Sequence, residues 1–291
     1  MIPSDQSDRA VVVGIATRNR VDVLRKSIQS ALQQSYRPLR VAVIDDASTD
    51  QTAYVGDEFT TVSWTRWQYG QGYIRARNHM MMTATDDYYV SLDDDAWFVQ
   101  GDEIAIAVDF LERWPKVAAV AFDILSPDCP HMVPRGKAVS VAMFVGCGHV
   151  LRLSAVKEMG GYVESPGLYG GEEKDLCIRL IDAGYQIVKF DGVHVWHDKS
   201  SLARDLADQH RSGVCNDLAF VLRRTPLGLI IPSLIWKISK HLVFSLRAGL
   251  LISCLKGFVK FGASANRVWC TRHPVRLSTL SRFRVLSKVV G

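Results

Sequence analysis

The chain has 291 residues, 48% of them hydrophobic, which is enough for one large domain or for a domain with an appendage. Its six cysteines are scattered without a CxxC pair, which argues against a disulfide framework or a zinc site and favours reduced thiols in a cytoplasmic protein. The N-terminal segment lacks the basic flank and long apolar core of a signal peptide.

The net charge of +5 hides an uneven distribution along the chain. Residues 1–198 carry 19 Lys and Arg against 27 Asp and Glu, whereas residues 199–291 carry 16 against 3. This change in composition predicts an acidic domain over 1–198 and a basic, apolar extension over 199–291. We expect the extension to contact something anionic, with a membrane surface or a nucleic acid as candidates.

The acidic part alternates predicted strands and helices. A continuous apolar run at 11–16 predicts a buried parallel strand, residues 39–44, apolar except for Arg40, predict a second strand, and apolar residues at helical spacing across 21–34 predict the helix between them. These three elements form a βαβ unit with a right-handed crossover. The alternation continues with strands at 61–67, 87–92 and 117–125, a helix that opens at 70–72 and runs to about 83, and a helix at 103–114.

The later elements are shorter. Residues 126–137 hold three prolines and are predicted to form a loop. We expect short strands at 139–145, 149–153, 186–190 and 193–196, helices at 154–159 and 172–183, and helical structure after residue 197. The fold class is therefore α/β: a Rossmann-like, mostly parallel sheet flanked by helices, with a C-terminal helical extension.

Three consecutive carboxylates, Asp93, Asp94 and Asp95, follow the predicted strand at 87–92. Side chains alternate faces on an extended segment, so Asp93 and Asp95 are predicted to point one way and Asp94 the other. Two carboxylates just past a strand end suit Mg²⁺ or Mn²⁺. A solvated acidic turn explains such a triplet equally well when it is considered alone.

Polar side chains also follow the first two strands. Asp45 and Asp46 end the second strand, and the turn after the first strand consists of Thr17, Arg18, Asn19 and Arg20. Ligands of open α/β sheets bind outside the carboxyl ends of the strands. We therefore expect these side chains to face one crevice with the acidic triplet and to contact a nucleotide. Helix capping is the alternative for the aspartates.

The helix near residue 75 carries Arg75, Arg77 and Asn78, which could bind phosphate or a sugar, although an exposed helix face is the more common place for arginines. Glu172 and Glu173 begin a helix after two glycines. Stabilisation by the helix dipole is one explanation for acidic residues at the start of a helix. The alternative is that one of them is a general base that removes the proton of an incoming hydroxyl.

His197 follows the last predicted strand, where a nearby acidic site would make it a metal or phosphate ligand. With these residues in view, the sequence resembles the family 2 glycosyltransferases of the GT-A fold. The resemblance covers about residues 11–198. It rests on segments that occur in the family's order: TRNR, VIDDASTD, ARN, LDDD, GGEEKDLCIRLIDAGY and VWH.

The resemblance implies an inverting transfer of a sugar from a nucleotide-diphosphate sugar, with UDP as the default nucleotide, to a hydroxyl acceptor. The acceptor would be a saccharide or a lipid-linked glycan in cell-surface polysaccharide synthesis. The family's acidic DXD motif would place Mn²⁺ or Mg²⁺ on Asp93 and Asp95, completed by His197. The nucleotide-sugar would contact Thr17, Arg18, Asn19, Arg20, Asp45, Asp46, Arg75, Asn78 and Asp94.

The resemblance also places the catalytic base in an acidic pair ahead of a helix. Here that pair is Glu172–Glu173, where the family has Glu-Asp, and Glu173 is the first choice with Glu172 the second. One alternative function is a sugar-nucleotide nucleotidyltransferase, although the TRNR turn lacks its glycine-rich phosphate loop. Another is a non-catalytic nucleotide-sugar-binding module, against which the intact acidic residues and His197 argue.

Residues 226–262 of the extension are apolar stretches interrupted by lysines and arginines. The longest uncharged run, 225–236, has 12 residues, whereas a spanning helix needs about 20. The pattern is typical of a helix lying in the membrane interface, which predicts a peripheral position on the inner face of the cell membrane. Packing on the first domain or on a second copy in a homo-oligomer is the alternative. Nucleic acid is disfavoured because aromatic residues do not alternate with the basic ones.

Overall fold

The computed structural model describes residues 8–134, 136–167, 169–198 and 205–289. The expectation about a signal peptide depends partly on residues 1–7, which lie outside this range, as does residue 199, where the predicted extension begins. The described residues fall into two compact units. The sheet unit lies within Met1–Gly161 and Ala183–Lys199, and the helical unit lies within Tyr162–Asp182 and Ser200–Val289. The domain boundary predicted at residue 198 stays a prediction.

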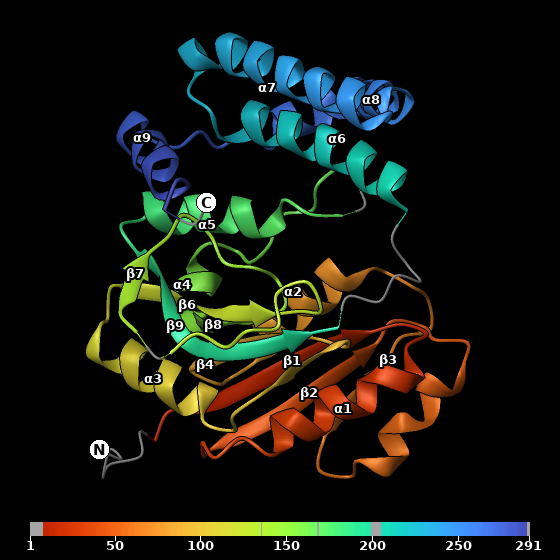
Figure 1. Ribbon diagram of the computed structural model, residues 1–291, viewed down its shortest axis with the longest axis vertical. Helices are drawn as coiled ribbons and strands as arrows, with labels where there is room; N and C mark the ends of the chain where they lie inside the picture. The colour runs from red at the N-terminus through yellow and green to blue at the C-terminus, as the bar shows by residue number, and fades with distance from the viewer. Residues whose placement is uncertain (1–7, 135, 168, 199–204, 290–291) are drawn as a thin grey trace. The chain divides into compact units, whose positions relative to one another are not determined.

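The sheet unit contains a nine-stranded sheet (Figure 1). Its strands are β1 (Val11–Thr17), β2 (Leu39–Asp45), β3 (Ser63–Arg66), β4 (Tyr88–Asp93), β5 (Ala96–Phe98), β6 (Val117–Leu125), β7 (Ala138–Ser140), β8 (His149–Arg152) and β9 (Gln186–His197). Its helices are α1 (Val21–Leu32), η1 (Gln51–Glu58, a 3₁₀ helix), α2 (Tyr73–Thr83), α3 (Glu103–Arg113) and α4 (Leu153–Glu158).

The strand order is β3-β2-β1-β4-β8-β6-β9-β5, with β7 paired to β9. Strands β3, β2, β1 and β4 are parallel, and their register places Thr17 beside Asp45 and Ala16 beside Asp93. Strand β8 runs antiparallel to both β4 and β6, so the sheet is mixed beyond β4. The carboxyl ends of β1, β2 and β4 therefore meet at one edge, as the predicted βαβ alternation requires.

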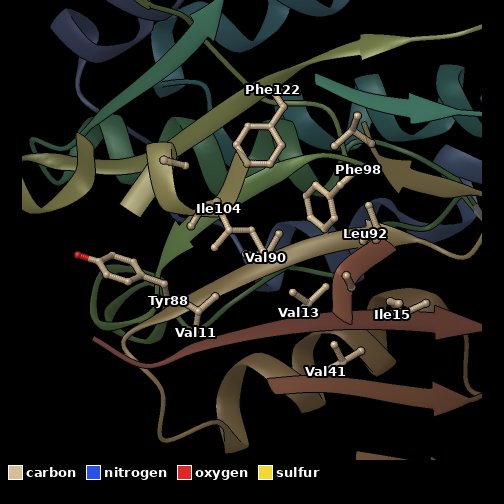
Figure 2. Close-up of a cluster of buried hydrophobic side chains, with 14 of the residues drawn as sticks. Val11, Val13, Ile15, Val41, Tyr88, Val90, Leu92, Phe98, Ile104 and Phe122 are labelled. Carbon is tan, nitrogen blue, oxygen red and sulfur yellow. The ribbon is translucent and has the colours of Figure 1, made fainter. Parts of the chain in front are cut away.

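The core of the sheet unit lies along β1 and β4. In Figure 2, Val13 and Ile15 of β1 lie beside Val90 and Leu92 of β4, and Phe122 of β6 joins the same cluster. The four aliphatic residues are at most 1% exposed. A strand that is covered on both faces needs no polar alternation, which is why the sequence shows continuous apolar runs here.

The largest differences from the predicted strands are at β7 and β9. Regular pairing of β7 ends at Ser140 rather than continuing to 145. In the segment that follows, the buried His149 ring stacks on Phe144, and its Nδ1 lies 2.8 Å from the Val145 carbonyl oxygen. Strands predicted at 186–190 and 193–196 form one strand, β9, because Gly192 adopts φ +80° at a register shift instead of ending it.

The helical unit consists of α5 (Glu172–Asp182), α6 (Leu206–Arg224), α7 (Leu227–Ala248), α8 (Leu251–Cys270) and α9 (Leu277–Leu286) (Figure 1). Helical structure predicted after residue 197 is confirmed for the residues described there. Pro226 stops α6, and Gly249 ends α7 with φ +68°. The core between α6, α7 and α8 includes Leu218, Ile230 and Cys254.

Helix α7 exposes most of its apolar residues. Leu227, Ile231 and Ile235, spaced four residues apart, form one exposed stripe, and Ile231 is 70% exposed. By length and composition, α7 is the one described helix that could cross a membrane, although a core helix of a soluble protein passes the same criterion. Only 6% of its most apolar stretch is buried, so the rest of the described chain leaves this helix largely uncovered.

Candidate active site

The turn after β1 is tied to the loop after β2. Asn19 adopts φ +54°, and its N–H donates to the Ser48 hydroxyl at 3.0 Å. Its side-chain oxygen accepts the Thr49 N–H at 2.8 Å. An Asn tolerates this left-handed conformation better than most residues, which accounts for its place in the turn. These hydrogen bonds hold the turn in one conformation at the edge of the sheet where the strands end.

Asp45 and Asp46, which are predicted to contact a nucleotide, both accept hydrogen bonds from backbone N–H groups in this structure. Asp45 is fully buried and accepts the Ser48 N–H at 2.8 Å. Asp46 accepts the N–H groups of Gln71 at 2.6 Å and Gly72 at 2.9 Å, which positions the start of α2. Arg18 reaches within 4.0 Å of Asp46. The two aspartates thus shape the crevice, and their contact with a nucleotide stays a prediction.

The acidic triplet divides between two directions as predicted, but Asp94 and Asp95 lie in a turn after β4 and not on an extended strand. Asp94 accepts a hydrogen bond from the Thr17 hydroxyl at 2.8 Å. Asp93 and Asp95 turn toward His197, whose Nε2 lies 4.0 Å from an oxygen of Asp93 and 3.1 Å from an oxygen of Asp95. Arg20 lies 3.6 Å from the other oxygen of Asp95. Six predicted site residues therefore meet at the ends of β1, β4 and β9.

His197 reaches the triplet because β9 pairs antiparallel with β5, which places His197 opposite Ala96. The ring is 7% exposed, and its Nε2 makes no hydrogen bond of acceptable geometry within the described residues despite the short distance to Asp95. A buried imidazole nitrogen of this kind, facing two carboxylates, fits a metal ligand. The donor set at this point therefore suits a divalent cation.

Cys147 was not among the predicted site residues. Its Sγ lies 3.4 Å from Nδ1 of His197, and ligand atoms of Asp93, Cys147 and His197 all lie within 4.8 Å of one another. Burial raises the pKa of the Cys147 thiol well above its usual value, and the charge of Asp93 adds to this effect. The neutral thiol therefore packs beside the imidazole, and no sequence spacing indicated this contact.

Asp94 has a strongly shifted pKa. Burial, followed by the negative charge of Asp95, raises the pKa of this carboxyl to about 7. The hydrogen bond from Thr17 and the charge of Arg20 act in the opposite direction. Closely spaced carboxylates that are removed from water disfavour each other's ionised form, and a nearby cation reverses that preference. The triplet is therefore better suited to holding a cation than to standing alone.

Arg77 is the arginine of α2 that reaches the triplet. It is 6% exposed and donates a hydrogen bond to Asp93. Arg75, which was predicted to bind the nucleotide-sugar, is exposed, and Asn78 lies so close to Gly161 that a Cβ there would come within 2.6 Å of its side-chain oxygen. Arg77 shares its helix face with the buried Met80 and Met81, a signal from which its burial could have been predicted.

The predicted base residues belong to the helical unit. Glu172 and Glu173 begin α5 after Gly170 and Gly171, which adopt φ +78° and +100°. Glu172 is buried and Glu173 is partly exposed. Asp175, one turn further, pairs with Arg179 at 2.9 Å, as its spacing predicts. The role of either glutamate as the base stays a prediction.

The sheet unit also contains a cavity of about 350 Å³. Residues of β6 form one side, and Cys129, His131 and Val133 of the predicted loop 126–137 form another. Lys189 lines it and pairs with Asp123 at 2.6 Å. A cavity of this size, with a few polar groups on an otherwise apolar wall, is in the range of small-ligand sites.

Residues 12–158, half of the chain, match the sequence model of Glycosyl transferase family 2. The chain therefore belongs to glycosyltransferase family 2, and the predicted GT-A fold is confirmed.

A curated relative is the pre-mycofactocin glycosyltransferase of Mycobacterium tuberculosis, which is 30% identical over 224 residues. That match covers 70% of this chain and 46% of the relative, so the chain spans less than half of that protein's length. Two solved structures share the fold. The mannosyltransferase PcManGT from Pyrobaculum calidifontis, in complex with GDP-Man and Mn²⁺, has a TM-score of 0.60 at 16% identity and covers 96% of this chain and 80% of its own. S. aureus TarS has a TM-score of 0.61 at 15% identity, with 90% and 83% covered.

Proposed function

We propose that this glycosyltransferase uses a divalent cation, Mn²⁺ or Mg²⁺, to transfer a sugar from a nucleotide-diphosphate sugar with inversion at the anomeric carbon. The observation that carries the proposal is the meeting of Asp93 and Asp95 with the buried Nε2 of His197. These three residues would hold the cation. When bound, it supplies positive charge that neutralises the leaving nucleoside diphosphate.

The surrounding side chains keep these ligands in place. Arg77 fixes Asp93 through a hydrogen bond, and Arg20 lies beside Asp95. Thr17 holds Asp94 away from the other two carboxylates, where it can contact the sugar or the ribose. Because each carboxylate has its own partner, the two ligand oxygens are oriented before the donor arrives, which lowers the reorganisation needed in the transition state.

We assign the general base to Glu173, with Glu172 as the second choice. The base removes the proton of the acceptor hydroxyl as its oxygen attacks the anomeric carbon from the face opposite the leaving group. A single displacement of this kind inverts the configuration. Glu173 is favoured because it is partly exposed at the start of α5, whereas Glu172 is buried.

The donor is taken to be a UDP-sugar by default, with Arg18, Asn19, Asp45, Asp46, Arg75 and Asn78 around the nucleotide. PcManGT was solved with GDP-Man and TarS with UDP, so both nucleotides occur on this fold. The acceptor, a saccharide or a lipid-linked glycan, would lie against the cavity beside loop 126–137. Residue 135 of that loop lies outside the described residues.

The test begins with donor binding, followed as thermal stabilisation by UDP-, GDP- and dTDP-sugars with Mn²⁺. With the donor known, Glu173→Gln should abolish transfer while donor binding is retained, because the amide keeps the shape but cannot accept the proton. Glu172→Gln is the matched variant. Transfer that is lost only in Glu172→Gln would exchange the two roles, and unchanged transfer in both would remove the pair from the reaction.

We also infer that residues 226–262 hold the protein on the cytoplasmic face of the cell membrane as a peripheral protein. Support comes from the exposed apolar stripe of α7 and from the excess of cations in this part of the chain. Sedimentation of the full chain with anionic vesicles tests the placement. Recovery entirely in the soluble fraction would contradict it.

A further inference from the structure

A second cavity, of about 770 Å³, lies within the helical unit between α5, α6, α7 and α9. Phe220 of α6 and Phe283 of α9 form a buried apolar wall, and Trp236 of α7 stands at the rim with 69% of its surface exposed. Its volume is within the range of sites that enclose most of a small ligand. None of these three residues has a part in the transfer proposed above.

Cations dominate the polar lining of this cavity, and no described lining residue is an Asp or a Glu. The cations come from three helices and the residues just after the last of them: Lys174, Lys237, Lys240, Arg284 and Lys288. The chain has no Asp or Glu beyond Asp217, so α7, α8 and α9 contribute no side-chain carboxylate at all. The positive charge is therefore spread over every side of the cavity that α7 and α9 form.

Asp217 neutralises only the inner part of this wall. Its carboxylate lies 2.7 Å from Lys174, 2.7 Å from Lys237 and 3.2 Å from His241. Within the residues that the structure describes, no carboxylate lies within ion-pair distance of Lys240, Arg284 or Lys288. Burial, partly offset by Asp217, lowers the pKa of Lys174, and the charges of Lys237 and Lys240 lower it further. An anion at the outer cations would relieve this repulsion.

The buried Phe220 and Phe283 and the exposed Trp236 indicate which kind of anion fits this cavity. A free phosphate would use the cations but not the phenylalanines or Trp236. The helix that carries Trp236, Lys237 and Lys240 also presents the exposed stripe of Leu227, Ile231 and Ile235. Tryptophan and lysine at the edge of an apolar surface are typical of a membrane interface, where the ring is amphipathic and the lysine stem lies along apolar surface.

We propose that this cavity binds one anionic phospholipid of the bilayer. The lipid phosphate lies at Lys240, Arg284 and Lys288, and the start of its acyl chains lies against Phe220, Phe283 and Trp236. Phosphate oxygens accept charge-assisted hydrogen bonds from such cations, and the apolar wall replaces part of the surrounding lipid. The inference rests on the membrane placement proposed for residues 226–262 and adds a defined headgroup site to it.

The first experiment titrates the purified full chain with monomeric dihexanoyl-phosphatidylglycerol by calorimetry, below the concentration at which that lipid forms micelles. Saturable binding of one lipid per chain is expected, at least tenfold tighter than binding of dihexanoyl-phosphatidylcholine or of glycerol 3-phosphate. Equal binding of the choline lipid would contradict a site for an anionic headgroup. Equal binding of glycerol 3-phosphate would show that the site takes a free phosphate and would also overturn the proposal.

A matched pair of triple variants locates the site. Lys240→Gln, Arg284→Gln and Lys288→Gln together should weaken binding of the monomeric lipid at least tenfold. The control, with the same loss of charge from the same helical unit, combines three exposed cations that do not line the cavity: Arg247→Gln, Lys256→Gln and Arg282→Gln. It should bind within twofold of the unchanged chain. Equal weakening in both triples would mean a diffuse electrostatic effect and no site.

Vesicles then separate the site from the membrane placement. The full chain should sediment with phosphatidylcholine vesicles that contain phosphatidylglycerol. Binding of the monomeric lipid without sedimentation would support the cavity and overturn the placement. Sedimentation that is equal for both triple variants, with no binding of the monomeric lipid, would support the placement and overturn the cavity as a lipid site.

Discussion

The sheet unit and the helical unit arrange charge in opposite ways. In the sheet unit, parallel strands end at one edge, and Asp93, Asp94 and Asp95 gather there with His197 at the end of β9. In the helical unit, cations from α5, α7 and α9 line one cavity, and Asp217, which is not a lining residue, pairs with two of them. Strand ends concentrate a few groups at a point, which suits an ion, whereas helix faces spread them along a groove, which suits a longer ligand.

The largest loss of stability is expected at Asp175, a buried carboxylate in the otherwise cation-rich helical unit. Asp175 accepts hydrogen bonds from Arg224 at 2.7 and 2.9 Å and from Arg179 at 2.9 Å. Asp175→Asn leaves two buried guanidinium groups short of a charge and should lower the free energy of unfolding by about 3–5 kcal/mol, as measured by urea denaturation.

The control for that change is Asp208→Asn, which removes an exposed pair with Arg211 and should cost less than about 1 kcal/mol. A loss as small for Asp175→Asn as for the control would show that the helical unit tolerates unbalanced cations even in its interior.

The next largest effect, on the rate of transfer, is expected at the acidic triplet of the sheet unit. Asp95→Asn should slow Mn²⁺-dependent transfer on the order of 100-fold or more, because one oriented carboxylate of the proposed cation site is lost. Release of nucleoside diphosphate measures the rate, and a titration with Mn²⁺ should show weaker binding. Asp109→Asn, in an exposed pair with Arg113 on α3, is the control. An unchanged Mn²⁺ titration in Asp95→Asn would contradict the site.

A smaller effect is expected from Asp217, the carboxylate that pairs with two lysines of the basic cavity. Burial would raise the pKa of Asp217, but the hydrogen bond from His241 and the charges of Lys174 and Lys237 hold it well below its usual value. Such a carboxylate stabilises the fold above its unfolded pKa of about 3.9, and the contribution is lost as the pH falls through the folded pKa. Asp217→Asn should therefore cost about 1–3 kcal/mol at pH 7.

The pH dependence of that difference is the sharper measurement. Urea unfolding at pH 7 and at pH 3 should show that the difference in stability between the unchanged chain and Asp217→Asn begins to shrink at the lower pH, because the unfolded chain then takes up a proton at Asp217 while the folded chain keeps the carboxylate ionised. A difference that is the same at both values would mean that packing, and not charge, gives Asp217 its role.

The smallest effect compares apolar residues in the two units. Ile15 is fully buried in the sheet, so Ile15→Val should cost about 0.5–1.5 kcal/mol. Ile231 is 70% exposed on α7, and Ile231→Val should change stability by less than about 0.5 kcal/mol. Thermal unfolding in the absence of lipid measures both. A comparable loss at Ile231 would show that another surface covers α7 in solution.

Much of the sheet unit was predictable because its signals are local. A buried parallel strand shows as a continuous apolar run, so β1, β2, β4 and β6 were found within one or two residues of their bounds. The gathering of Thr17, Asp93 and Asp95 followed from the rule that parallel strands end at one edge, whereas His197 joins them through the pairing of β9 with β5. The antiparallel insertion of β8 and the short β5 depend on long-range pairing, which no local pattern encodes.

The missed contacts have the same cause. Cys147 meets His197 across 50 residues of chain, and no spacing rule connects them. Arg77 was read together with Arg75 as a phosphate-facing pair, yet the two point to different sides of α2. The hydrogen bonds of Asp46 to backbone N–H groups appear only once the loop before α2 is folded. The residue types predicted which edge of the sheet would carry the functional site. The individual contacts depend on how the strands pair, which the sequence pattern does not show.

The cavity beside loop 126–137 has a consequence for how this family diversifies. The proposed cation ligands Asp93 and His197 end strands whose register is fixed by neighbours on both sides, whereas residues 126–137 form no regular strand or helix where the structure describes them. Insertions and deletions in such a segment leave the sheet unmoved. With the acceptor placed against this loop as proposed, a descendant of this chain could exchange one acceptor for another by changing loop length while inheriting the donor end unaltered.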